Sequence, residues 1–319
     1  MADDDVRDGV TLTNLDQPLF KDAGATKRDL VEYLEALQDR IIPVLRDRPL
    51  SVIRVVRGQQ PFMQKNLPAY APEWIQRVSM WAEASKREVT YALCNDRRTL
   101  LWFANQRAVE YHPGLMSAGE WEHPTHLVLD LDPPSPGAFD LAARAAQLVR
   151  QVLIEAGMAG AVKTSGAKGL HVFVPLQAAT FEEAAAVTRA IAARAERLDP
   201  GIATTAFLRE DRGGKVFIDS TRAGGATVVA AYSPRVRNGV PVSFPLAWDD
   251  LDRVSPGDFT VLNVTRLIGA GDPWAEHMPP PQRLDPGLVE EGRAIPIARV
   301  QGMHEGRRRQ RSGQSLPPQ

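Results

Sequence analysis

Apolar and polar residues follow one another along the chain with two different spacings, which predict a mixture of helices and strands. Helical spacing of three and four residues appears in three segments, 26–45, 141–153 and 180–198. Short runs rich in β-branched residues predict strands at 50–57, 126–132, 169–176, 215–220 and 226–233. The segment 91–112 predicts a short strand, a turn and a helix. Together these elements indicate an α+β (mixed α/β) fold.

Two of the predicted helices begin with residues that cap a helix N-terminus. Thr26 is followed by Asp29, and Thr180 is followed by Glu183. At this spacing the threonine and the acidic side chain each accept a backbone N–H group of the first turn. The two pairs therefore predict helix starts near 26 and 180.

The ends of the chain differ in composition from the region between them. Residues 1–9 are acidic, whereas residues 301–319 are basic and poor in apolar side chains. Segments of this kind bury too little apolar surface to fold, so we predict that both are disordered. Residues 10–300 form the predicted folded region.

Composition narrows the classes of function. The net charge is −1 with a pI near 6.6, which argues against bulk coating of nucleic acid but is compatible with a local basic groove. The single cysteine, Cys94, excludes an internal disulfide framework and a multi-cysteine zinc site. No apolar run is long enough to cross a bilayer, and the N-terminus lacks signal-peptide features. We therefore expect a cytoplasmic protein with no membrane partner.

The predicted strand at 126–132 carries two aspartates within an apolar run. Alternate residues of a strand share a face, so Asp130 and Asp132 point to one side and the leucines between them to the other. The two carboxylates are about 7 Å apart along the backbone and can converge on a hard cation. In the alternative, Asp132 caps the following turn and Asp130 forms a salt bridge. Sugar transferases and phosphatases with an aspartyl nucleophile use the same pattern.

A third carboxylate, Asp219, ends the apolar strand predicted at 215–220. On a neighbouring strand it could join the first two in holding two divalent ions, the arrangement that stabilises both oxygens in phosphoryl transfer. Taken alone, Asp219 is equally compatible with a residue that starts a turn.

The segment 163–173 supplies positive charge and hydrogen-bond donors. Its glycines can form a tight loop whose backbone N–H groups face an anion, although the sequence is not the Walker pattern. The residues that could contact a phosphate there are Ser165, Gly166, Lys168 and His171. Arg222, Arg235 and His112 are further candidates. A glycine hairpin with a packed histidine, surface arginines and a structural His112 are the alternatives.

Nine segments in order resemble the polymerase module of bacterial ligase D, which belongs to the archaeo-eukaryotic primase superfamily. They span about 12–265 and read TNLDQPLF, TKRDLVEYL, RPLSVIRVVRG, PFMQKN, AVEYH, LVLDLDPP, TSGAKGLHVFVPL, KVFIDS and AYSPR. The resemblance implies a primase-type catalytic sheet with a flanking N-terminal α/β layer, divided near residue 118.

The resemblance also implies the activity and its site. It suggests a template-directed nucleotidyltransferase that adds nucleotides, with ribonucleotides preferred over deoxyribonucleotides, to a primer 3′-hydroxyl in short gaps or at DNA ends. Asp130, Asp132 and Asp219 would bind two Mn²⁺ or Mg²⁺ ions. The residues implied to hold the NTP or dNTP are His112, Ser165, Gly166, Lys168, His171, Arg222 and Arg235.

DNA, gapped or with a 3′ overhang, would lie over the N-terminal half. The implied contacts are Lys27 and Arg54 in a pocket for a 5′-phosphate, Phe62 and Met63 at the template base, and Lys65. Stacking on Phe62 would hold an unpaired base without regard to sequence, whereas a core phenylalanine is the alternative. Gln17 stands where the family usually has lysine, and Met63 replaces a second aromatic residue. We expect weaker 5′-phosphate capture and altered stacking.

Two rival functions remain open from the residues. A DNA-gap or DNA-end binding module with little synthesis would not need three carboxylates. A metal phosphohydrolase, argued from Asp130 and Asp132 alone, leaves Asp219 and the glycine loop unexplained. No ligase segment follows the polymerase region in this sequence. We therefore expect a monomeric, stand-alone bacterial enzyme, associated with the nucleoid, that acts with a separate ligase or other repair proteins.

Overall fold

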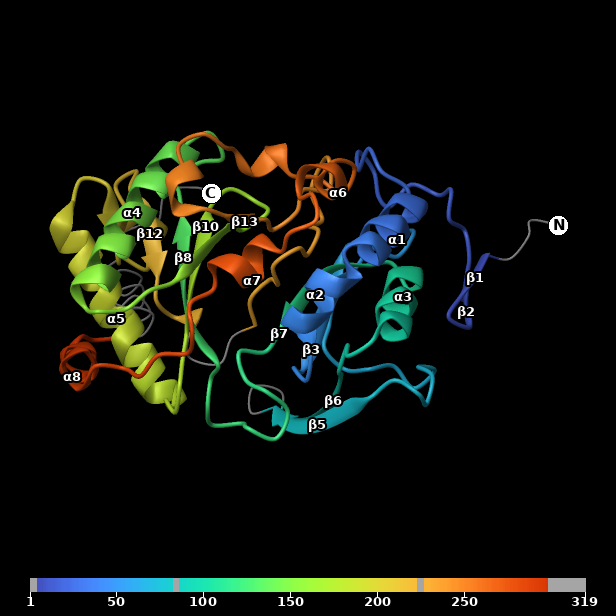
Figure 1. Ribbon diagram of the computed structural model, residues 1–319, viewed down its shortest axis with the longest axis horizontal. Helices are drawn as coiled ribbons and strands as arrows, with labels where there is room; N and C mark the ends of the chain where they lie inside the picture. The colour runs from blue at the N-terminus through green and yellow to red at the C-terminus, as the bar shows by residue number, and fades with distance from the viewer. Residues whose placement is uncertain (1–4, 83–85, 223–226, 298–319) are drawn as a thin grey trace, which may run out of the picture.

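Two sheets, one in each of two lobes, organise the computed structural model, which describes residues 5–82, 86–222 and 227–297 (Figure 1). In the N-terminal lobe the strand order is β4-β3-β6-β5, and β7 pairs with β3. The strands are β3 (Leu50–Arg54), β4 (Phe62–Gln64), β5 (Arg77–Ala82), β6 (Arg87–Ala92) and β7 (Ala108–Pro113). The helices of this lobe are α1 (Lys27–Ala36), α2 (Gln38–Leu45) and α3 (Arg97–Asn105).

The second sheet has the order β11-β12-β8-β10-β9-β13. Its strands are β8 (His126–Asp132), β9 (Ala161–Thr164), β10 (Leu170–Pro175), β11 (Ala203–Thr204), β12 (Val216–Asp219) and β13 (Pro245–Leu246). The helices that follow β8 in the chain are α4 (Phe139–Glu155), α5 (Phe181–Leu198), α6 (Val264–Leu267), α7 (Pro273–His277) and α8 (Pro286–Ala294). Among the described residues, this lobe also has short 3₁₀ segments at 209–211, 248–250 and 256–258.

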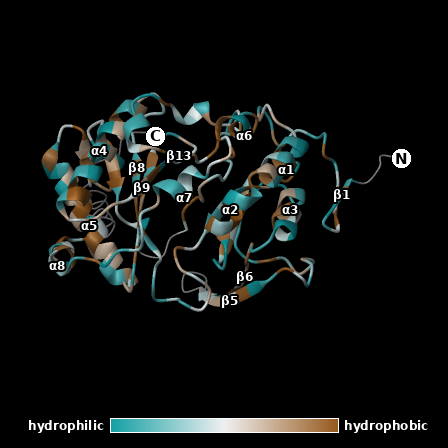
Figure 2. Cartoon of the chain, in the orientation of Figure 1, coloured by the Kyte–Doolittle hydropathy of each residue, from teal (hydrophilic) through white to brown (hydrophobic). Residues whose placement is uncertain are grey.

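Helices α4 and α5 pack on the second sheet through their apolar sides. Both helices carry hydrophilic and hydrophobic residues (Figure 2), and the buried ones include Val149 of α4 and Ile191 of α5. Burial of one apolar stripe is what holds an amphipathic helix against a sheet. Among the described residues, no helix combines the length and hydrophobicity that a membrane span requires.

The predicted helix starts are confirmed. Thr26 accepts the Asp29 N–H group, and Thr180 accepts that of Glu183, each in a complete capping box. The single helix predicted at 26–45 is instead two, because Leu37 leaves helical geometry with φ −104° and ψ 12°. The bend keeps the apolar residues of both α1 and α2 in the core.

The strand predicted at 226–233 is wrong for 227–233, the part that the structure describes. Its backbone N–H groups bond to different neighbours, since Ala230 donates to Tyr111 O and Tyr232 donates to Ser243 O. Tyr232 also has a positive φ of 66°. The β-branched run is therefore buried between the two lobes without pairing continuously to either sheet. In 91–112 the prediction missed β7.

The predicted disorder of 1–9 is wrong from residue 5 onward. Residues Asp5–Arg7 form β1, which pairs with β2 (Val10–Leu12). Arg7 forms ion pairs with Asp5 and with Glu35 of α1, which anchors this acidic segment to the folded lobe. Residues 1–4 and the predicted tail at 301–319 lie outside the described residues. The chain passes from the first sheet to the second between β7 and β8, where the predicted division near 118 falls.

A substitution at Gly169 can test how closely the start of β10 approaches β8. A Cβ atom at this position would lie 2.0 Å from the carbonyl oxygen of Leu131, which belongs to the backbone and cannot turn aside. We expect Gly169→Ala to lower the free energy of unfolding by about 1–3 kcal/mol, as overpacking does. The measurement is urea unfolding. Gly137→Ala, whose Cβ would meet nothing within 4 Å, is the matched control. Equal stability of the two variants would contradict the close approach.

Candidate active site

The site is built on a row of residues that lie side by side across four strands. Asp219 of β12 is opposite Asp130 of β8, Asp130 is opposite His171 of β10, and His171 is opposite Lys163 of β9. Directly paired residues of antiparallel strands project from the same face. Asp132 joins that face because it is two residues from Asp130. The prediction that Asp219 lies on a strand beside Asp130 is confirmed.

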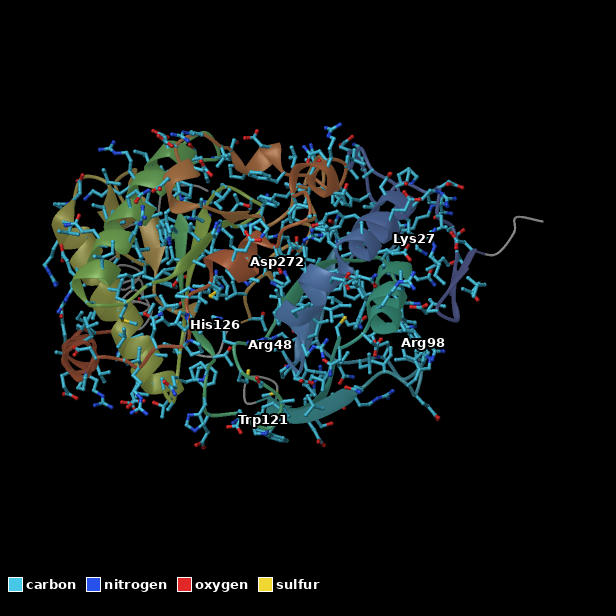
Figure 3. All side chains as sticks on the ribbon, in the orientation of Figure 1. Lys27, Arg48, Arg98, Trp121, His126 and Asp272 are labelled. Atoms are coloured by element: carbon cyan, nitrogen blue, oxygen red, sulfur yellow. The ribbon has the colours of Figure 1, made fainter. Side chains whose placement is uncertain are left out.

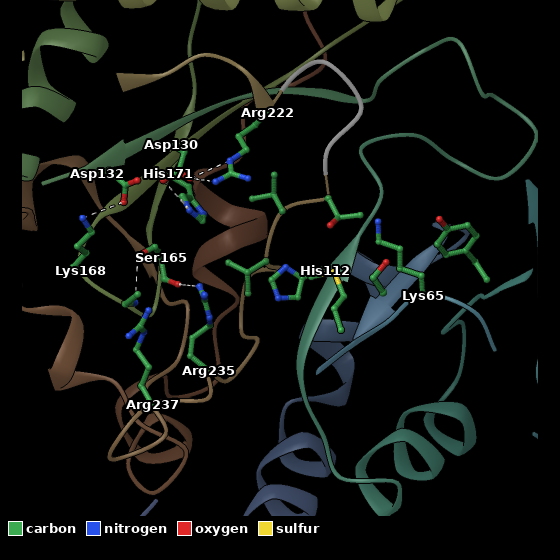
Figure 4. Close-up of a pocket in the computed structure, with 17 residues that line it drawn as sticks. Lys65, His112, Asp130, Asp132, Ser165, Lys168, His171, Arg222, Arg235 and Arg237 are labelled. Carbon is green, nitrogen blue, oxygen red and sulfur yellow. Dashed lines mark hydrogen bonds and ion pairs between the residues drawn. The ribbon is translucent and has the colours of Figure 1, made fainter. Parts of the chain in front are cut away.

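Arg222 links the two buried carboxylates of this row. Its guanidinium lies 3.2 Å from Asp130 Oδ2 and 3.5 Å from Asp219 Oδ2. On the other side of Asp130, His171 Nε2 is 3.4 Å from Oδ1 (Figure 4). Burial alone would raise the pKa of Asp130, but His171 and Arg222 lower it to about 2. Asp130 is therefore a carboxylate at neutral pH.

Asp132 is the third carboxylate on this face, and its basic partner is Lys168. Its Oδ1 lies 3.7 Å from Lys168 Nζ, and burial together with Asp130 raises its pKa. Within the described part of the chain, no three His, Cys, Asp or Glu side chains form a group that could hold a metal ion. The three acidic side chains lie on one face of the sheet, but each is paired with a basic group, because Arg222 contacts Asp130 and Asp219 and Lys168 contacts Asp132.

The glycine loop is tight, but it is closed by its own serine. Gly166 has a positive φ of 65°, and a Cβ there would lie 2.6 Å from Arg235 Cγ. Ser165 Oγ accepts the backbone N–H groups of Ala167 and Gly169 at 3.2 and 3.1 Å. These two groups therefore face Ser165 and not an anion, which corrects the expected amide cradle. The Lys168 amine donates to Pro133 O at 2.7 Å.

Glu110 is a buried residue of the site that the sequence analysis missed. Its Oε2 lies 2.8 Å from His112 Nε2 and 3.0 Å from Arg235 Nε, and its Oε1 accepts the Val236 N–H group. Burial would raise the pKa of Glu110, but these partners lower it to about 2. Its position two residues before His112 on one strand face was the available signal.

A cavity of 510 Å³ between the two lobes brings most of the predicted nucleotide site together (Figure 4). Predicted residues in its lining are His112, Asp130, Asp132, Ser165, Lys168, His171, Arg222, Arg235, Met63 and Lys65. Ser51, Tyr91 and Arg237 also line it and were missed. Asp219 and Gly166 are not in the lining, but Asp219 is paired with Asp130 and Gly166 follows Ser165. One wall thus comes from each lobe.

Three residues of the predicted DNA surface lie away from this cavity. Lys27 is buried in the N-terminal lobe, far from His126 of β8 (Figure 3), and its amine donates to Thr13 O and to Asn105 Oδ1, both at 2.6 Å. Burial, with Arg107 nearby, lowers the pKa of Lys27 to about 8. Its amine is therefore engaged within the protein.

Arg54 and Phe62 lie on the other side of β3 and β4 from the cavity-lining Met63. Arg54 donates to Gln64 and to the Gln106 backbone, and its guanidinium is 5.9 Å from the ring centroid of Phe62. Phe62 is 37% exposed and Met63 is 44% exposed. The alternative of Phe62 as a core residue is therefore wrong.

Comparison with known proteins places the chain in a family. Residues 26–274 match the family model described as LigD, primase-polymerase domain. The bifunctional non-homologous end joining protein LigD of Bacillus subtilis is 33% identical over 277 residues, which cover 85% of this chain and 44% of that protein. The multifunctional non-homologous end joining DNA repair protein LigD of Mycobacterium tuberculosis is 33% identical over 279 residues, or 82% and 36%.

The solved polymerase domain of Mycobacterium tuberculosis ligase D, in complex with DNA, has the same fold. It superposes with a TM-score of 0.77 at 30% identity and covers 84% of this chain and 97% of that domain. The fold and the family model define a primase-polymerase, hence a nucleotidyltransferase. The chain belongs to the family of the LigD primase-polymerase domain, and it spans less than half the length of the curated relatives named above.

The lowered pKa of Glu110 predicts that this residue contributes to the stability of the fold in a pH-dependent way. Its pKa is lowered from 4.5 to about 2 in the fold, so it stabilises the folded state above pH 4.5 and this contribution is lost as the pH falls toward 2. We expect the unfolding free energy of the wild type to fall more steeply across that interval than that of Glu110→Gln. Urea unfolding at a series of pH values measures it, with the exposed Glu73→Gln as control. Parallel profiles would contradict the assignment.

Proposed function

We propose that this chain is a template-directed nucleotidyltransferase that extends a primer 3′-hydroxyl in short DNA gaps or at DNA ends, with ribonucleotides preferred. The observation that carries the proposal is the shared cavity, whose lining combines the carboxylates of Asp130 and Asp132 with the basic side chains of Lys168, Arg222 and Arg235. A triphosphate needs the basic side chains, and two-metal phosphoryl transfer needs the carboxylates. The family assignment supports the same chemistry.

The donor set suits Mn²⁺ or Mg²⁺. Carboxylate oxygens are the ligands that these hard cations prefer, and Asp130, Asp132 and Asp219 would hold two of them. When bound, such ions supply activation of the attacking hydroxyl and neutralisation of phosphate charge. Arg222 already pairs with Asp130 and Asp219, so it would have to release them. Its guanidinium would then be free to contact the triphosphate that enters the same cavity.

The remaining residues of the cavity would orient the nucleotide. Lys168 and Arg235 bring positive charge to the phosphates, and His171 brings a ring N–H donor. His112 is held by Glu110 on the opposite wall, which belongs to the other lobe. Fixed donors of this kind raise the rate chiefly by positioning and by electrostatic stabilisation.

DNA is the proposed template and primer. The related mycobacterial domain was solved in complex with DNA, which supports a DNA substrate here. Met63 lines the cavity together with Lys65 and would contact an unpaired template base there, and the exposed Phe62, on the other face of β4, would stack on a further template base outside the cavity. Because net charge is close to zero, binding would depend on such local contacts.

Replacement of Asp130 distinguishes an enzyme that synthesises strands from a protein that only binds DNA. We expect Asp130→Ala to lower primer extension with Mn²⁺ or Mg²⁺ and NTPs by about 1000-fold or more, since several kcal/mol of charge stabilisation would be lost. DNA affinity should change little. A primer-extension assay with pyrophosphate detection measures it, and the exposed Asp252→Ala is the control.

Absence of extension by the wild type with either metal would favour a DNA-gap or DNA-end binding module. Release of inorganic phosphate without strand growth would favour a phosphohydrolase. Either result would overturn the proposal.

Gln17 allows a test of 5′-phosphate capture. The Gln17 carbonyl accepts the Lys27 backbone N–H group at 2.9 Å, so a lysine at 17 would add a cation beside Lys27. We expect Gln17→Lys to increase the preference for 5′-phosphorylated gapped DNA and to steepen the salt dependence of log Kd by about 1. Fluorescence anisotropy at several salt concentrations measures both, with Gln17→Leu as control. An unchanged preference would place the phosphate elsewhere.

A further inference from the structure

Lys163 is a buried lysine next to His171 in the row that also holds Asp130 and Asp219. The proposed reaction gives this lysine no role. It lies on β9 with 0% exposure, directly opposite His171. A buried lysine is costly unless its amine is well bonded. None of its contacts within the described residues is a carboxylate at ion-pair distance, so charge pairing does not account for its place. The hydrogen bonds of its amine with Ser243 and His171 account for its place.

The amine of Lys163 has three neighbours, all of which suit a donor. Its Nζ lies 2.6 Å from Ser243 Oγ and 2.9 Å from His171 Nδ1, and it sits 5.3 Å from the ring centroid of Phe173. Ser243 uses its own hydroxyl proton on Thr164 O at 2.7 Å. Ser243 Oγ therefore accepts from Lys163, which fixes the direction of this hydrogen bond.

The same geometry decides which nitrogen of His171 carries the proton. An amine that donates to Nδ1 leaves the proton on Nε2. Nε2 points to Asp130 Oδ1 at 3.4 Å (Figure 4), where an N–H group is attracted to the carboxylate. In the other tautomer two acceptors would face each other at that contact. Both flanks of the ring thus select the Nε2–H form.

We propose that Lys163 is a positioning residue that holds His171 in the Nε2–H tautomer, so that the imidazole keeps an N–H donor on the cavity side, where it now faces Asp130 and would contact the nucleotide triphosphate once metal ions occupy that carboxylate. A histidine whose Nδ1–H group is bonded to a carbonyl or carboxylate offers Nε2 as an acceptor, which suits a metal. Here an amine takes the place of that partner, and the tautomer is reversed. The resulting Nε2–H group is a donor, which suits an anion. The triphosphate as recipient rests on the proposed function.

The first test is spectroscopic and does not depend on catalysis. The chain has 6 histidines, so imidazole ¹⁵N–¹H correlation spectra can resolve His171, assigned by its disappearance in His171→Gln. We expect the Nε2–H pattern in the wild type and loss of that pattern, by ring reversal or averaging, in Lys163→Met. An unchanged tautomer in Lys163→Met would overturn the proposal.

The second test is a double-mutant cycle on nucleotide affinity. With a non-hydrolysable NTP as probe, we expect Lys163→Met to raise Kd about 10-fold, and the double variant Lys163→Met/His171→Gln to bind no more weakly than His171→Gln alone. Additive losses would show that Lys163 acts apart from His171 and would overturn the proposal. Lys21→Met, at an exposed lysine outside the cavity, should change neither readout.

A further variant covers loss of folding in Lys163→Met. Ser243→Ala leaves the amine in place but removes its second anchor, so we expect partial mixing of His171 tautomers and a smaller rise in Kd. A wild-type tautomer in Ser243→Ala, when Lys163→Met does not fold, would overturn the proposal. If the tautomer shifts as expected but the wild type neither binds NTP nor extends primers, the proposed function fails while the role of Lys163 stands.

Discussion

The antiparallel pairing of β8 with β12 on one side and with β10 on the other is the constraint on which the site depends. It sets Asp219, Asp130 and His171 in one row. A shift of one residue in either pairing would turn a whole strand over. The buried Leu129 and Leu131, which share the opposite face, oppose such a shift because it would expose them. The apolar face of β8 thus holds the acidic face in register.

The charges of the site are balanced by specific partners. Arg222 lies against Asp130 and Asp219, and Glu110 lies between His112 and Arg235. Buried charges of this kind persist only where a partner and hydrogen bonds replace water. Asp130, Arg222, His112 and Arg235 also line the cavity, so the contacts that stabilise the fold hold side chains that the proposed reaction uses. Entry of a nucleotide with its metal ions would exchange these partners for phosphate and metal contacts.

The sequence predicted the face on which the aspartates lie and the loop that carries Ser165. It could not predict which hydrogen-bond partners the polar side chains of the site would take. Ser165 Oγ accepts hydrogen bonds from two backbone amides of its own loop, and the Lys27 amine donates a hydrogen bond to Thr13 O within the N-terminal lobe. These outcomes depend on which polar groups are brought within about 3 Å by packing, and residue spacing carries no such information.

Local periodicity and capping residues determined the helices, the main strands and the alternation that places Asp130 and Asp132 together, because these follow from backbone geometry within a few residues. The tertiary structure alone decided that 227–233 pairs with two different neighbours, and that Lys163 and Glu110 belong to the site. Their partners are brought to them by strand pairing and by the junction of the two lobes. Contacts between distant segments depend on how whole sheets pack, and that is settled only when the chain is folded.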